Sequence, residues 1–167
     1  RPKLLCLPNP DSPTGTVLSQ TELRNVLYVC ELNRTVLLVD EAYHPFYEPT
    51  VVSWTSSSHN LIVARTFAKA WGNAGLRIGY AIAHPETAEL LHKMRPMYET
   101  STLAIEFMYR MLDHVKDMEQ SVSRIEKAKF FFQHEMQHMG LKVLPTAGNY
   151  LHVAFGENGP VIHKALA

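Results

Sequence analysis

Lys69 stands in a segment, Ala64–Tyr80, whose other residues are mostly apolar or small. The hydroxyl of Thr66 precedes this lysine by three positions, and the guanidinium of Arg77 follows it by eight. Burial in apolar surroundings penalises a charged amine, and the neutral amine is the nucleophile that forms a Schiff base with an aldehyde cofactor. Thr66 and Arg77 are donors suited to a phosphate, Arg77 as a planar fork. The segment therefore indicates a buried lysine that binds an aldehyde, with phosphate donors nearby.

A second candidate is Asp40, which directly follows the apolar run Val36–Val39. A run of this length is typical of a strand buried on both faces of a parallel sheet. Because ligands of such sheets bind beyond the carboxyl ends of the strands, we expect Asp40 at the edge where a site would lie. Taken alone, an aspartate in this place is more often a turn or cap residue than a catalytic group.

A third segment, Asn9–Gly15, reads Asn-Pro-Asp-Ser-Pro-Thr-Gly and precedes the other two. In this order the three segments resemble the motifs of the pyridoxal-phosphate-dependent aminotransferases of class I/II, the fold type I enzymes. The end of the lysine segment, Ala-Gly-Leu-Arg-Ile-Gly-Tyr at 74–80, is most similar to the histidinol-phosphate aminotransferase branch. The resemblance continues through 80–83, 95–96 and 148–150, so it covers nearly the whole chain.

The resemblance implies a role for each candidate residue. Lys69 would hold pyridoxal 5'-phosphate covalently and later carry the proton between substrate and cofactor. Asp40 would pair with the protonated pyridine nitrogen, and Tyr43 would hydrogen-bond the phenolic oxygen of the cofactor. Thr66 and Arg77 would contact the cofactor phosphate. A final position departs from the family: Ser12 occupies the place of a cofactor-contacting asparagine, with a hydroxyl of shorter reach.

The implied activity is the transfer of an amino group between an amino donor and a 2-oxo acid. The donor would be an amino acid or an amino-alcohol phosphate of the histidinol-phosphate kind, in amino-acid biosynthesis. One alternative uses the same site to decarboxylate a phosphorylated amino acid, and another is a non-catalytic domain or fragment that only binds the cofactor. The resemblance also implies a homodimer, since a second subunit completes the active site in this family.

Members of the family are considerably longer than 167 residues, so we expect this chain to be a central fragment. Residues 1–115 would be part of the cofactor-binding large domain. Residues 116–167 would form the connecting long helix and the start of a small α+β C-terminal subdomain. The first phosphate-binding amides and the residue stacked on the cofactor ring would precede Arg1, and the arginine for the substrate carboxylate would follow Ala167. The isolated chain is therefore expected to be inactive.

A competing motif is His134–His138, which reads His-Glu-Met-Gln-His and matches the zinc-protease signature. At about 100° per residue, both histidines fall on the side of the helix opposite Ile125. The face that we expect to be buried is marked by Val122, Ile125, Phe132 and Met139. Because Glu157 is the only carboxylate downstream, a third ligand is also unclear. We therefore predict solvent-facing histidines and no metal site.

Composition agrees with a piece of a soluble intracellular enzyme, and the resemblance implies a cytoplasmic one. Lys plus Arg and Asp plus Glu each number 16, so no net charge favours nucleic acid or an acidic membrane as a partner. Cys6 and Cys30 lie in apolar runs without C-x-x-C spacing, which predicts buried free thiols in a reducing compartment. No apolar run approaches the ~20 residues of a membrane span.

The elements that must position these residues alternate as strand, helix and strand, which predicts an α/β fold with a mostly parallel sheet. In the strand expected at 76–83, Arg77 should point opposite to Leu76 and Ile78. A capping box at Ser19–Glu22 should open a helix with one apolar face. The strands are expected at 4–7, 36–39, 61–64, 76–83, 142–144 and 150–155. The later helices are expected at 86–94 (with Pro85 at its first position), 101–116 and 118–139, and a loop at 53–60.

Overall fold

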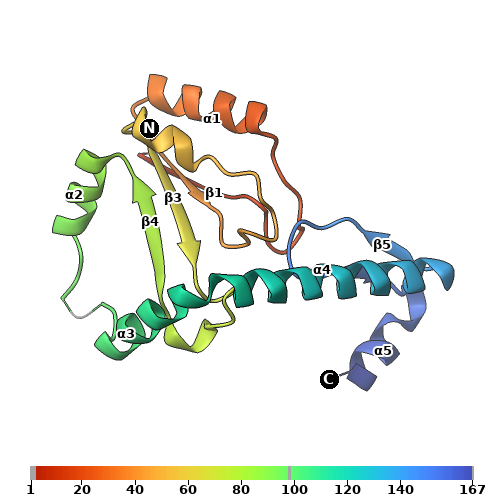
Figure 1. Ribbon diagram of the computed structural model, residues 1–167. Helices are drawn as coiled ribbons and strands as arrows, with labels where there is room; N and C mark the ends of the chain where they lie inside the picture. Colours follow the sequence, from red (N-terminus) through yellow and green to blue (C-terminus); the bar gives the residue numbers. More distant parts are fainter. Residues whose placement is uncertain (1–2, 98, 167) are drawn as a thin grey trace.

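The computed structural model describes residues 3–97 and 99–166 (Figure 1). Its larger sheet has the strand order β1-β2-β3-β4, in which β1, β2 and β3 are parallel and β4 is antiparallel to β3. The strands are β1 (Leu4–Pro8), β2 (Val36–Asp40), β3 (Leu61–Thr66) and β4 (Gly79–Ala83). Helices flank this sheet, and the prediction of an α/β fold with a mostly parallel sheet is confirmed.

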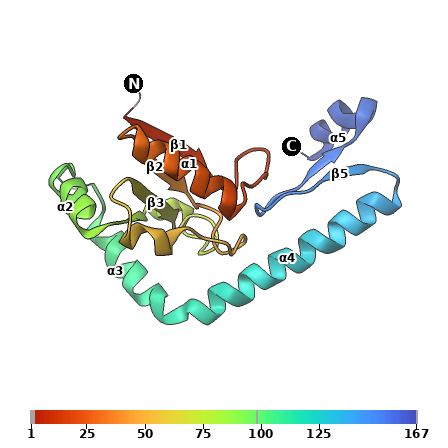
Figure 2. The same ribbon diagram turned by 90° about the horizontal axis from the view of Figure 1, so that it is seen from above.

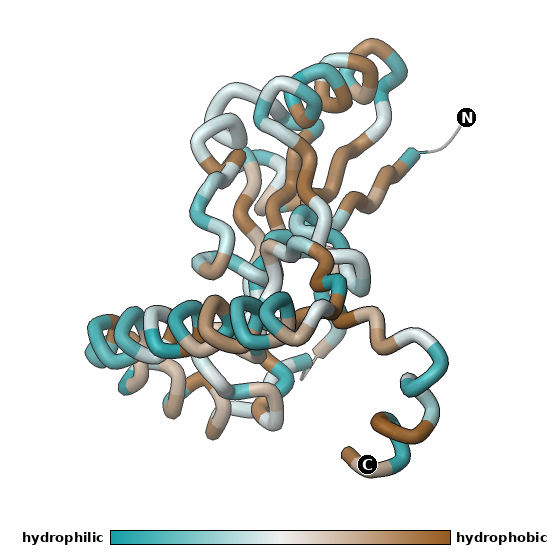
Figure 3. The backbone as a smooth tube through the Cα atoms, turned by 90° about the vertical axis from the view of Figure 1, so that its right-hand side faces the viewer, coloured by the Kyte–Doolittle hydropathy of each residue, from teal (hydrophilic) through white to brown (hydrophobic). Residues whose placement is uncertain are grey.

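Helix α1 (Gln20–Leu32) begins at the predicted capping box. The Ser19 hydroxyl accepts a hydrogen bond from the backbone N–H of Glu22, and the Glu22 carboxylate accepts one from the backbone N–H of Ser19. The helix packs its apolar face on alternate residues of β2 and β3. Figure 3 shows hydrophobic stretches of backbone within the part of the molecule that holds the N-terminus, and mixed colouring along its helices. The core consists of Leu23, Leu27, Cys30, Leu37, Val39, Val51, Leu61 and Val63. Full burial of one such leucine or valine contributes about 1.5–3 kcal/mol, so this interface stabilises the sheet.

Beyond β4 the chain is mainly helical. Helix α2 (Pro85–Lys93) has Pro85 at its first turn, as predicted. Helix α3 (Thr102–Met111) continues through a 3-10 turn, η3 (Leu112–His114), into the long helix α4 (Val115–His138). Figure 2 shows α4 running from the larger sheet to the C-terminal elements.

The C-terminal elements are β5 (Lys142–Leu144), β6 (His152–Ala154), the 3-10 turn η4 (Gly156–Asn158) and α5 (Gly159–Leu166). Strands β5 and β6 form a separate antiparallel pair. The loop between them returns to the first sheet, because the Ala147 N–H donates to the Gly15 carbonyl at 2.9 Å. Gly15 has φ +73°, and a Cβ there would lie 2.0 Å from Thr146 Oγ1, so the contact requires glycine.

Several sequence-based expectations are wrong in detail. The strand expected at 76–83 begins only at Gly79, because Ala74–Leu76 forms a 3-10 turn, η2, and Arg77 is left-handed with φ 53°. The alternation argument for Arg77 therefore fails. The expected loop at 53–60 begins within a 3-10 helix, η1 (Val52–Ser56). Helix α5 was not predicted, and β6 is shorter than expected.

Two predictions of burial are also wrong. Cys6 is exposed because β1 is an edge strand of the sheet, whereas Cys30 is buried as expected. On α4, Phe132 and Met139 are 44% and 70% exposed, because little of the chain packs against the end of this helix. Val122 and Ile125 are partly buried, and no residue of α4 is fully buried, because helical phase does not tell whether another element covers a face. Among residues 3–97 and 99–166, none of the helices combines the length and apolar character that crossing a bilayer requires.

Candidate active site

Three of the four strands place predicted site residues at or just beyond their carboxyl ends, which together form one edge of the larger sheet. Asp40 is the last residue of β2, and Thr66 is the last residue of the parallel strand β3. Ser12 lies in the turn that follows β1, and the Asn9 N–H at the start of that turn donates to the Asp40 carbonyl at 2.9 Å. Parallel strands therefore bring segments that are distant in sequence to a common edge, as expected for a ligand site.

Tyr43 lies at the centre of this edge and is only 6% exposed. Its hydroxyl donates to the Ser12 Oγ at 3.4 Å. Its ring meets Tyr150 edge-to-face at a centroid distance of 5.5 Å, and the Lys69 Nζ lies 5.2 Å from its centroid. The structure therefore brings Ser12, Tyr43 and Lys69 together around one aromatic ring.

The Lys69 side chain is exposed, which contradicts the expectation of a buried lysine. The neighbouring Ala70 is buried, whereas the Lys69 amine lies beside the Tyr43 ring. A mostly apolar composition along the sequence does not show whether the lysine within it is buried. The Tyr43 ring, rather than a closed pocket, is the surface that the Lys69 amine meets.

Asp40 has a structural role in addition to its place at the sheet edge. Its Oδ1 accepts a hydrogen bond from the Ala42 N–H at 2.9 Å, which is an Asx-type turn. This is the turn role that a strand-terminal aspartate commonly has. The bond engages one oxygen of the carboxylate and holds the group at the carboxyl end of β2.

Thr66 and Arg77 lie where strands β3 and β4 meet. Thr66 is paired with Gly79 in the antiparallel ladder, and its Oγ1 accepts from the Ala68 N–H at 3.0 Å. Arg77 is exposed, and its guanidinium donates to the Ala74 carbonyl at 3.1 Å. Both donors thus lie beside the Lys69 turn, but the Arg77 contact is with its own loop.

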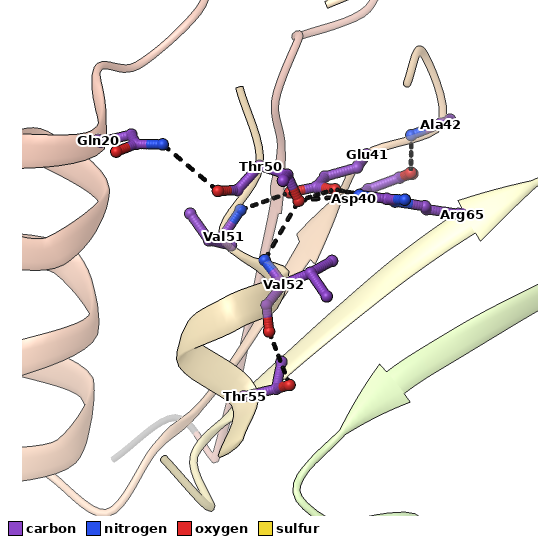
Figure 4. A network of polar contacts seen from close by, with 9 residues as sticks. All are labelled: Gln20, Asp40, Glu41, Ala42, Thr50, Val51, Val52, Thr55 and Arg65. Atoms are coloured by element: carbon purple, nitrogen blue, oxygen red, sulfur yellow. Dashed lines mark hydrogen bonds and ion pairs between the residues drawn. The ribbon is translucent and has the colours of Figure 1, made fainter. Parts of the chain in front are cut away.

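Sequence reasoning missed a buried polar network behind the site, shown in Figure 4. The Glu41 carboxylate is 3% exposed and accepts from the Arg65 guanidinium at 2.8 Å. Thr50 Oγ1 lies 2.9 and 2.8 Å from the two Glu41 oxygens, and the Val51 N–H donates to Glu41 at 3.0 Å. This network ties the segment after β2 to β3 and to the loop before η1. One signal in the sequence could have pointed to this network: both of its charged residues are adjacent to predicted site residues, since Glu41 follows Asp40 and Arg65 precedes Thr66.

Tyr150 was also missed as a member of the site, although it lies within the recognised pattern. Its hydroxyl donates to the Asp11 carbonyl at 2.9 Å, which fixes the turn that carries Ser12. Burial raises the pKa of Tyr150, and the neighbouring Tyr43 adds to the effect. The hydroxyl therefore remains a proton donor. Contacts across this sequence distance leave no periodic signal in the chain.

A cavity of about 690 Å³ lies between the segment after β2 and helix α4. Its walls include Thr66, Trp71 and His44, with Glu119 and Glu126 on the α4 side. The His44 Nδ1 is buried and has no hydrogen-bond partner among the described residues. Burial lowers the pKa of His44, and the positive charge of Arg65 adds to this, so the neutral imidazole is favoured. Among the six predicted site residues, Thr66 also borders this cavity.

The zinc-protease motif on α4 is arranged as the helical phase predicts. His134 and His138 are exposed, with ring centroids 4.4 Å apart. Glu135 contacts the neighbouring His134 at 3.2 Å. Within residues 3–97 and 99–166, this pair is not joined by a third side chain that could complete a metal site.

The donor set at the sheet edge fits pyridoxal 5'-phosphate. It contains an amine that can bond an aldehyde, a carboxylate for a protonated ring nitrogen, and a phenol for an oxygen atom. These groups belong to Lys69, Asp40 and Tyr43. The Lys69 amine already lies 5.2 Å from the centre of the Tyr43 ring. Hydroxyl and guanidinium donors for a phosphate, from Thr66 and Arg77, lie on the adjoining segment.

Comparison with known proteins gives a consistent result. The sequence profile of the family described as aminotransferase class I and II matches residues 1–165. The histidinol-phosphate aminotransferase of Akkermansia muciniphila is 32% identical over 168 residues, which cover 99% of this chain and 46% of that protein. That of Caldanaerobacter subterraneus is 33% identical over 166 residues, with 99% and 46% coverage. The chain spans about half the length of the curated relatives it matches.

Solved structures agree. The histidinol-phosphate aminotransferase from Sinorhizobium meliloti, crystallised in complex with pyridoxal-5'-phosphate, superposes with a TM-score of 0.78 at 28% identity, over 96% of this chain and 44% of that one. The enzyme of the same name from Clostridium acetobutylicum gives a TM-score of 0.84 at 20% identity, over 98% and 52%. The L-threonine-O-3-phosphate decarboxylase from Porphyromonas gingivalis, with a TM-score of 0.75 at 24% identity over 92% and 48%, shares the fold.

Proposed function

Because this chain belongs to the aminotransferase class I and II family, we propose that it carries the cofactor-binding part of a pyridoxal-5'-phosphate-dependent aminotransferase. The enzyme transfers an amino group from an amino acid or an amino-alcohol phosphate of the histidinol-phosphate kind to a 2-oxo acid. The sequence relatives named histidinol-phosphate aminotransferase support this choice of donor. One structural observation carries the proposal: the Lys69 amine and the Ser12 hydroxyl meet at the Tyr43 ring, on the sheet edge where Asp40 ends β2.

In this proposal each side chain has a defined task. When bound, the cofactor supplies an electron sink for the negative charge that develops on the α-carbon of the substrate. Asp40 would hold the proton on the pyridine nitrogen. Tyr43 would donate to the phenolic oxygen, and its hydroxyl would then accept from the Ser12 hydroxyl instead of donating to it. The Nζ of Lys69 would hold the aldehyde carbon of the cofactor, with loss of water. After the substrate amine displaces it, the free amine of Lys69 would take up the proton that leaves the α-carbon.

Phosphate binding and the wider organisation complete the proposal. Thr66 and Arg77 bind the cofactor phosphate. Arg77 would exchange its exposed contact with the Ala74 carbonyl for the phosphate, at little cost. Residues 1–115 belong to the large domain and residues 116–167 to the connecting helix and the small subdomain, which is supported by the separation of the two sheets. A homodimer would cover apolar side chains that are exposed in this chain, and a cytoplasmic location is supported by the two free cysteines.

Decarboxylation of a phosphorylated amino acid is the alternative that the sequence leaves open. The solved decarboxylase from Porphyromonas gingivalis is 24% identical to this chain and supports only the shared fold. The two reactions differ in which substrate bond is broken, and the six site residues serve both. The sequence relatives favour amino transfer, so we give it priority.

The proposal is tested on the intact protein loaded with pyridoxal 5'-phosphate. Borohydride reduction followed by peptide mass spectrometry should place the cofactor on Lys69. Attachment to Lys93 or Lys142 would contradict the site assignment. The enzyme, supplied with histidinol phosphate and a 2-oxo acid, should form the amino acid that corresponds to the oxo acid. Supplied with a phosphorylated amino acid, it should release no carbon dioxide, and sustained release would favour the decarboxylase alternative. Lys69→Ala should abolish turnover, whereas Lys93→Ala, which changes an exposed lysine on α2, should leave it intact.

A further inference from the structure

His59, His84 and Glu86 form a side-chain cluster at the opposite end of the larger sheet from Lys69. His59 lies in the turn before β3, and His84 directly follows β4. Glu86 lies in the first turn of α2, the helix beside the far end of β4 in Figure 1. At about 3.3 Å per residue, the length of β3 separates this cluster from the lysine site by roughly 17 Å. The cluster therefore has no part in the proposed transamination.

The geometry of the three side chains suits one small ion. Each offers a ligand atom, and these atoms all lie within 4.8 Å of one another. The His59 Nδ1 and the Glu86 Oε2 are 3.6 Å apart, and the rings of His59 and His84 have centroids 3.7 Å apart. Tetrahedral zinc with bonds of ~2.0–2.2 Å holds its ligand atoms ~3.3–3.6 Å from one another. The His59–Glu86 pair already has this separation.

A second observation also points to a missing ligand. The Nδ1 of His84 is buried and has no hydrogen-bond partner among the described residues. A buried polar atom without a partner is costly, and a cation bound through this nitrogen would satisfy it. The backbone of the cluster is already tied together, since the Thr87 hydroxyl donates to the His59 carbonyl at 3.0 Å. The half-exposed His59 and the exposed Glu86 can rotate onto an ion from the solvent side.

We propose that His59, His84 and Glu86 bind a divalent transition-metal ion of the zinc type. Two imidazoles and one carboxylate are ligands that zinc accepts, and three protein ligands leave a fourth position for water. Magnesium and calcium prefer oxygen ligands, so they should compete poorly here. The ion would join the turn before β3 to the start of α2 and stabilise that end of the sheet.

The test uses the intact protein with bound pyridoxal 5'-phosphate and without tag histidines, treated with a chelator and then titrated with zinc chloride. Calorimetry should show one zinc site, and zinc, but not magnesium, should raise the melting temperature because it binds the folded state. Cobalt in place of zinc should give the visible absorption of a low-coordinate ion. His59→Ala, His84→Ala and Glu86→Gln should each weaken zinc binding by about tenfold or more.

The exposed histidine pair of α4 provides the matched control. The double variant His134→Ala/His138→Ala removes two imidazoles, which is the number in the proposed zinc site, and should keep the zinc affinity of the original protein. If His84→Ala fails to fold, the exposed positions His59 and Glu86 still decide the matter. Three results would overturn the proposal. The zinc affinity could stay unchanged in His59→Ala and Glu86→Gln, it could be lost in the α4 double variant, or the original protein could bind no zinc.

Discussion

The Nζ of Lys69 lies 5.2 Å from the centre of the Tyr43 ring. The hydroxyl of the same ring donates to Ser12, and its edge meets Tyr150. One buried aromatic side chain therefore sets the relative positions of the amine, the turn after β1 and the C-terminal loop. Ring and hydroxyl can be separated by mutation, because they contact different partners.

Tyr43→Phe keeps the ring and removes the hydroxyl. We expect the fold and the Lys69 contact to persist, while the turnover number falls about fivefold, the equivalent of one hydrogen bond of about 1 kcal/mol. Steady-state kinetics of amino transfer measure the effect. Tyr28→Phe, at an exposed tyrosine of α1, is the control and should change nothing. A Tyr43→Phe enzyme with unaltered kinetics would remove the hydroxyl from the proposed site.

Asp40 allows its turn role to be separated from its charge. In Asp40→Asn the amide oxygen can still accept from the Ala42 N–H, so stability should be kept while the rate falls by about 100-fold or more. Asp40→Ala should lose the rate and, in addition, about 1 kcal/mol of stability. Kinetics and urea denaturation of both variants give the comparison. Normal turnover by Asp40→Asn would leave Asp40 as a turn residue only.

The Glu41–Arg65 ion pair should dominate the stability of the site region. Glu41→Gln leaves the largely buried Arg65 charge without its partner, which we expect to cost about 3–5 kcal/mol. The exposed pair Glu106–Arg110 is the matched control, and Glu106→Gln should change the free energy of unfolding by about 0.5 kcal/mol or less. Urea denaturation of the intact protein measures both. Equal losses of unfolding free energy in Glu41→Gln and Glu106→Gln would mean that burial of the Glu41–Arg65 pair adds nothing to its contribution to stability.

His44 should make stability depend on pH. Because burial lowers its pKa in the folded state, the unfolded chain takes up a proton first as the pH falls below the ordinary value of 6.5. The contribution of the neutral His44 ring to the free energy of unfolding is therefore present above pH 6.5, and it is lost as the pH falls through the lowered pKa. His44→Gln should flatten this acid-side loss, whereas His92→Gln, at an exposed position, should not. An ordinary NMR titration of the His44 ring would refute the prediction.

Local patterns in the sequence determined most of the elements and the sheet edge at which we propose the site. The capping box at Ser19 and the apolar run before Asp40 act through neighbouring residues, so they can be read without knowledge of the fold. The same holds for the solvent-facing histidines of α4, which follow from helical phase. The order of the three motifs was sufficient to identify the family.

Only the tertiary structure decided which side chains meet and which are covered. Lys69 is exposed and lies over the Tyr43 ring, although its segment is mostly apolar. The bond from Tyr150 to the Asp11 carbonyl and the cluster of His59, His84 and Glu86 join segments that no periodicity links. Such contacts depend on strand order and on the packing of loops at the ends of the sheet. These are properties of the assembled chain, so local spacing cannot encode them in a readable form.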